Sequence, residues 1–148
     1  MARAVSVMAA VLVLLGVGWF FGQRPVSGLK QQLEEQEQAF LTEKADLELR
    51  ANTAEAKGLL WAAHAEILIA TQDVTRKNFG TASDRVSRAR DLITRAAGIP
   101  GITLDLGGVR DITESALTQI GALDPGAPET LKLAASELSR ILEKVGQA

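Results

Sequence analysis

The strongest constraint in the sequence is an uncharged apolar stretch close to its start. Residues 4–22 read AVSVMAAVLVLLGVGWFFG, nineteen positions without a charged side chain. As a helix they would rise by roughly 28 Å, close to the roughly 30 Å thickness of the hydrocarbon core of a bilayer. The sequence therefore predicts one transmembrane helix, which forms an N-terminal membrane anchor over residues 1–25.

The residues at the end of this stretch also favour an anchor. Trp19, Phe20 and Phe21 stand together, and aromatic rings concentrate at the boundary between hydrocarbon and headgroups. Arg24 can extend its charge into the same layer. A cleaved signal peptide is the alternative. The apolar stretch is longer than the usual signal-peptide core of about 7–15 residues, however, and the following GQRPVSG lacks an A-x-A-like cleavage site.

The positive-inside rule leaves the orientation balanced, because Arg3 and the amino terminus stand against Arg24 and Lys30 on the other side. A short positively charged tail more often stays inside. We therefore expect a single-pass membrane protein whose C-terminal domain faces outward, into the periplasm if the protein is bacterial. A cytoplasmic domain is the alternative.

Residues 26–57 favour a helix, because they are rich in Gln, Glu, Lys, Leu and Ala. A helix can break or kink at Pro25, just before them. An apolar stripe with a spacing of seven runs through this segment and beyond it, at Val26, Leu33, Phe40, Leu47, Ala54, Trp61 and Leu68. The second seam position of a coiled coil is only half filled, since polar residues occupy it at Gln36, Glu43 and Arg50. We predict a long amphipathic helical stalk.

Two interpretations of the stripe remain open. It covers the core of the protein's own domain, or it lies against the helix of a partner. In the second case Leu33, Phe40 and Leu47 are the candidate partner interface.

A small helical bundle is predicted for residues 58–148. Residues 58–70, GLLWAAHAEILIA, are apolar on nearly every face, which is typical of a central helix buried among others. Residues 78–81 have turn chemistry, with Gly80 for unusual dihedral angles. A second helix then extends to about Ala97. Its apolar stripe consists of Phe79, Ala82, Val86, Ala89, Ile93 and Ala96.

Part of that stripe follows a known pattern. Phe79, Ala82, Val86 and Ala89 place an aromatic, a small, a large and a small residue at spacings of three and four. The run resembles the second helix of a tetratricopeptide hairpin, over about a quarter of the chain. The resemblance implies one antiparallel helix hairpin.

Two more helices follow a loop at residues 99–108, which is rich in Gly and Pro. The first covers about residues 109–123, with Ile112, Ala116, Leu117 and Ile120 on its apolar face. The second covers about residues 128–145, with a stripe of Leu131, Ala134, Ala135, Leu138, Ile141, Leu142 and Val145. Short connections between helices imply an up-down bundle, so the fold class is all-α.

Composition restricts the chemistry. The chain has no Cys, which excludes disulfides, Cys-based metal sites and a thiol nucleophile. Its one His, His64, lies in the most apolar stretch and is interpreted as a core residue. Glu66 and Asp73 share a helix face, but the Glu-x-x-His pairs of a carboxylate-bridged metal bundle are absent. We therefore expect no enzymatic activity, no cofactor and no metal.

The basic residues concentrate in the predicted hairpin. Arg76, Lys77, Arg85 and Arg88 form a candidate basic surface for lipid headgroups or an acidic partner. The alternative is a solvated face whose arginines pair with acidic residues of the last two helices. Nucleic acid is not an expected partner, because the net charge is −2 and no aromatic residues alternate with the basic ones.

These features predict a non-catalytic, membrane-anchored interaction or assembly protein, a scaffold that acts through helix–helix contacts. Lipid would bind the N-terminal span, and a protein partner or a second copy would bind the stalk and the span. An alternative is a structural accessory subunit of a large respiratory or photosynthetic membrane complex. A ligand-binding bundle is a further alternative.

Overall fold

The computed structural model describes the backbone of residues 2–147 and the side chains of residues 29–145. The described backbone forms four helices and no strand: α1 (Ala2–Thr75), α2 (Phe79–Ala97), α3 (Gly107–Gly121) and α4 (Ala127–Gln147). The prediction of an all-α fold is confirmed. The chain divides into two compact units, Met1–Asp46 and Leu47–Ala148, and each is described by itself.

The first unit consists of the N-terminal part of α1, which continues through Pro25 without ending there. The predicted span at residues 4–22 and its boundary residues Trp19, Phe20, Phe21 and Arg24 lie outside the described side chains. Among the residues that are described, no helix combines the length and the apolar character needed to cross a membrane.

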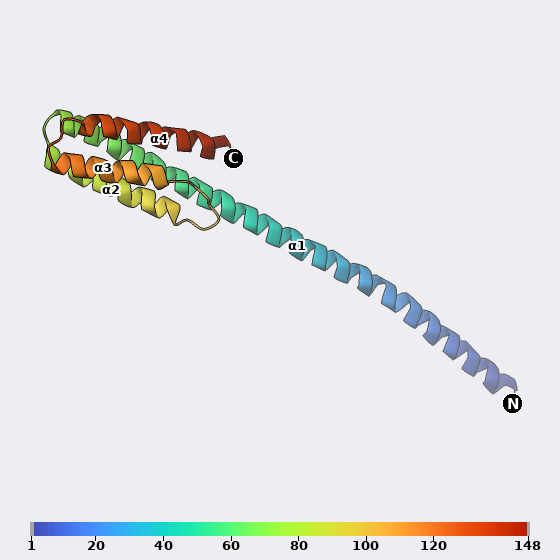
Figure 1. Cartoon of the computed structure of the whole chain (residues 1–148). Coiled ribbons are helices and arrows are strands. Elements are labelled where there is room, and N and C mark those ends of the chain that lie inside the picture. Colours follow the sequence, from blue (N-terminus) through green and yellow to red (C-terminus); the bar gives the residue numbers. More distant parts are fainter. Residues whose placement is uncertain (1, 148) are drawn as a thin grey trace. The chain divides into compact units, whose positions relative to one another are not determined.

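The second unit is a four-helix bundle built from the C-terminal part of α1 with α2, α3 and α4 (Figure 1). Helix α2 packs against α3, and α3 packs against α4. Side-chain bonds join α1 to its two neighbours: Arg85 of α2 binds Glu66, and Ser139 of α4 contacts His64. Successive helices run antiparallel (Figure 1), so the predicted up-down bundle and its α1–α2 hairpin are present.

The core is made mainly of Leu, Ile, Val and Ala from all four helices. The predicted stripes of α2 and α4 are buried as expected, with Phe79 partly buried at the edge. Helix α3 differs, because Val109 and Thr113 are buried beside Ala116 and Ile120, while Ile112 and Leu117 are only partly buried. Thr113 can occupy a core position because its hydroxyl donates to the carbonyl of Val109 at 2.7 Å.

The connection between α1 and α2 differs from the predicted turn. Gly80 lies inside α2, whereas Lys77 has the positive φ of 63°. The N–H groups of Lys77 and Asn78 donate to the carbonyls of Val74 and Asp73, which closes the end of α1. The left-handed residue is therefore a Lys rather than a Gly.

The connection between α2 and α3 is a loop, as predicted, and its ends are packed: Ile99 and Leu106 are buried. Asn52 of α1 donates a hydrogen bond to the carbonyl of Pro100 at 2.9 Å. This bond fixes the loop to the part of α1 with which the second unit begins.

Candidate helix-docking face

Helix α1 has two apolar faces within the second unit. One faces the core and is fully or nearly fully buried: Ala56, Leu60, Ala63, Ile67, Ala70 and Val74. The prediction that residues 58–70 are buried on nearly every face is wrong, because Trp61 and Leu68 remain 58% and 47% exposed. The rest of the bundle covers one side of α1 and leaves the opposite side open.

The open side is itself a continuous apolar series. It consists of Leu47, Ala51, Ala54, Gly58, Trp61, Ala65 and Leu68, all exposed, and we call it the outer face of α1. From Ala54 onward, each member lies two residues before a member of the buried face. Two residues turn an α-helix by about 200°, so the two faces point in opposite directions.

The outer face has the spacing of a coiled-coil seam. Its members alternate four and three apart, and none carries a charge. The sequence did not predict this complete seam. It placed the second seam position at Gln36, Glu43 and Arg50, where the residues are polar. The seam is filled instead at Ala51, Gly58 and Ala65, whose small side chains gave a weak apolar signal.

The predicted interface residues divide between the two units. Leu47 opens the outer face and is 58% exposed. Leu33 and Phe40 belong to the first unit, where they are 66% and 64% exposed. In that unit the positions equivalent to Ala51 are charged, at Glu37 and Lys44, so the uncharged seam begins at Leu47.

Trp61 lies near the middle of the outer face and is oriented by a neighbour. Its ring meets the ring of His64 edge to face, with centroids 5.8 Å apart and planes at 87°. His64 is in turn 3.2 Å from the hydroxyl of Ser139, measured from Nε2 to Oγ. A half-buried His that bonds to α4 therefore supports the exposed indole.

A Ser in contact with a His is also the starting point of many hydrolases, but this pair lacks their surroundings. An acyl-transfer site needs N–H groups free to bind an oxyanion. Ser139 lies in the middle of α4, where the backbone N–H groups already donate to helix carbonyls. We interpret the contact as structural. His64 is only partly buried, so the predicted core position is not confirmed.

The predicted basic surface is mostly neutralised where it meets α1. Arg85 donates to Glu66 at 3.0 Å and to Asp73 at 2.9 Å, and Arg88 lies 3.5 Å from Glu66. Glu66 and Asp73 thus share a face, as predicted, but their role is to bind arginines of α2. Asp73 is only 7% exposed, so this pairing satisfies a buried carboxylate.

The same contacts act on the ionisation of Arg85. The hydrogen bond to Glu66 is the largest effect that raises the pKa of the guanidinium above its usual value, and Asp73 acts in the same direction. A raised pKa favours the cation, so the group stays charged at every pH below its usual pKa. Arg76 and Lys77, by contrast, are exposed at the end of α1.

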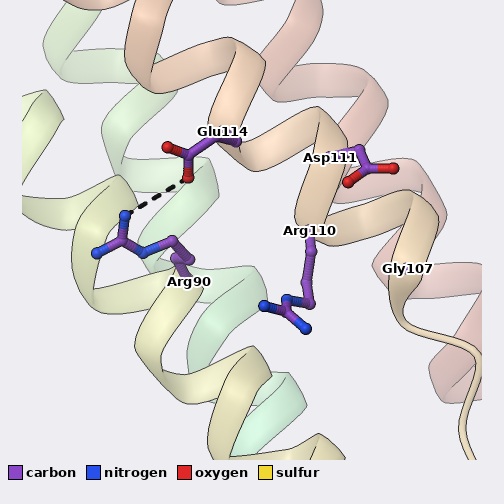
Figure 2. A pocket seen from close by; sticks show the side chains of 5 residues that line it. All are labelled: Arg90, Gly107, Arg110, Asp111 and Glu114. Atoms are coloured by element: carbon purple, nitrogen blue, oxygen red, sulfur yellow. Dashed lines mark hydrogen bonds and ion pairs between the residues drawn. The ribbon is translucent and has the colours of Figure 1, made fainter.

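An open pocket of about 410 Å³ lies between α2 and α3, lined by Arg90, Gly107, Arg110, Asp111 and Glu114. Figure 2 shows the side chains of Arg90 and Arg110 extending from the two helices, with Glu114 joined to Arg90. That ion pair spans 3.5 Å, and the side chains of Arg90 and Glu114 are 41% and 65% exposed. Ligand pockets are mostly apolar, so this solvated group of charges is a weak candidate for a small-molecule site.

Among the described residues, no cluster of three or more His, Cys, Asp or Glu side chains could hold a metal ion. Comparisons with protein-family models, with curated proteins and with solved structures find no match for this chain.

Proposed function

We propose that this protein is a non-catalytic, membrane-anchored interaction protein that binds a partner helix through the outer face of α1. The observation that carries the proposal is an uncharged seam of seven residues that stays exposed in a folded bundle. Large contiguous apolar patches on a folded surface commonly mark interaction sites. The uncharged stretch at residues 4–22 supplies the proposed anchor.

The chemistry of the outer face supports a helical partner rather than a small ligand. Its large side chains, at Leu47, Trp61 and Leu68, are separated by Ala and Gly, which let a second helix approach closely. Full burial of a large apolar side chain stabilises by roughly 1.5–3 kcal/mol, so covering the exposed half of each contributes about 1 kcal/mol per residue. Trp is also enriched among residues that dominate binding energy.

The test is a paired substitution in the full-length chain. Trp61→Glu together with Leu68→Glu places two charges on the outer face, and we expect it to abolish partner association, measured by detergent extraction and native sizing. Thermal stability should change little, because both side chains are exposed in the bundle.

A matched control is available on α4. Leu133 is 55% exposed but does not lie on α1, so Leu133→Glu makes the same chemical change away from the outer face. It should leave association intact. Equal association of the Trp61/Leu68 variant and the parent would contradict the proposal.

A further inference from the structure

We infer that the partner helix is α1 of a second copy of this chain, packed parallel and in register along the outer face. The inference rests on the proposed function and adds the identity and direction of the partner. Its evidence is the distribution of charge beside the seam.

The two flanks of the outer face carry opposite charge. In heptad terms Leu47, Ala54, Trp61 and Leu68 occupy d, and Ala51, Gly58 and Ala65 occupy a. The g flank then contains Arg50 and Lys57, and the e flank contains Glu48 and Glu55. Charges at e and g set the orientation and the choice of partner in coiled coils.

Parallel pairing brings opposite flanks together. In a parallel pair, each g residue lies beside the e residue five positions later on the other helix. Arg50 therefore meets Glu55 of the second copy, and the symmetry of the pair repeats this contact. In an antiparallel pair, basic flanks would meet basic flanks and acidic would meet acidic. The chain thus complements a parallel copy of itself.

The extent of the contact also follows from the sequence. Upstream of Leu47, a parallel copy would place Glu37 against Glu37 and Lys44 against Lys44 in the seam. These like charges oppose close packing, so the contact covers residues 47–68. Two chains anchored by their N-termini in one membrane also leave it in the same direction, which agrees with parallel pairing.

Cysteine cross-linking tests this arrangement directly, since the natural chain has no Cys. Ala51→Cys and Ala65→Cys replace small exposed residues seven positions either side of Gly58. In full-length protein in detergent, under mild oxidation, each variant alone should form a covalent dimer. Ser136→Cys, exposed on α4, is the control and should stay monomeric.

The possible failures are distinguishable. If neither variant cross-links alone while the chain is still a dimer, the pair is not parallel and in register, and the inference is overturned. If nothing cross-links and the chain is a monomer, the second copy is excluded. The proposed function is then tested separately, by whether the Trp61→Glu and Leu68→Glu double variant loses a different protein that binds the parent chain.

Charge exchange gives an independent measurement. Arg50→Glu alone and Glu55→Arg alone each create two like-charged contacts in a parallel pair, and both should weaken self-association. Mixing the two variants restores opposite charges at both contacts. Mixed dimers should then outnumber each like dimer several-fold; a random distribution would overturn the assignment of partners.

Discussion

Leu60 and Trp61 are neighbours in α1 and have opposite roles. Leu60 is completely buried in the bundle, and Trp61 is more than half exposed on the outer face. Covering so exposed a Trp with a partner would bury apolar surface and stabilise the complex. His64 already limits the rotation of Trp61 through the edge-to-face contact. Both residues are apolar in the sequence, so hydrophobicity alone could not separate a core residue from a docking residue.

Two leucines of α1 test this separation. Leu60→Ala removes a fully buried side chain and should lower the free energy of unfolding by about 2–5 kcal/mol. Leu68→Ala makes the same change on the outer face, where about half of the side chain is exposed, and the unfolding free energy of dilute protein should fall by no more than about 1 kcal/mol. Urea denaturation measures both. Equal losses would show that the two faces are not distinct.

The ion pairs show what sequence could and could not supply for single residues. The spacing of Glu66 and Asp73 predicted a shared face, which is confirmed by their common contact with Arg85. The pairing itself joins residues 12 and 19 positions apart on two helices. It depends on how α1 and α2 pack, and the periodicity of one helix contains no information about that.

At the scale of elements, periodicity predicted α2 and α4 well because each has one apolar stripe and a polar remainder. It failed for α1 because a helix with two apolar faces has the same pattern as a helix surrounded by others. Only the bundle distinguishes them: three further helices cannot cover α1 on every side. Because one side of α1 stays uncovered, the folded structure identifies the complete seam with Ala51, Gly58 and Ala65, which the sequence pattern did not.

The α1–α2 connection yields a prediction of its own. Lys77→Gly should stabilise the bundle by about 1 kcal/mol, because Gly adopts the left-handed conformation without the clash of a Cβ. Gly80→Ala should also stabilise by up to about 1 kcal/mol, since Gly80 is helical and an added Cβ meets nothing within 4 Å. Thermal unfolding measures both changes.

A control separates charge from conformation in this turn. Lys77→Ala removes the same charge but keeps a Cβ, so it should lack the gain of Lys77→Gly. If Gly80→Ala destabilises strongly, Gly80 is the special turn residue that the sequence first indicated.

At the scale of the whole molecule, the anchor and the bundle have separate tasks in the proposed function. Full-length protein should sediment with membranes and remain there after alkaline extraction, as an integral span would. Deletion of residues 2–25 should release it into the supernatant. Substitution of Trp61 and Leu68 by Glu in the intact chain should leave sedimentation unchanged. Release of the full-length chain by alkaline washing would contradict the anchor.

The opposite faces of α1 also bear on the order of synthesis. A ribosome completes α1 at Thr75, but Val145, the last of the described core residues, follows roughly 70 residues later. At about 5–20 residues per second, both apolar faces of the nascent helix stay uncovered for several seconds. Neighbouring nascent chains on one messenger would therefore present their outer faces to each other before either bundle is complete.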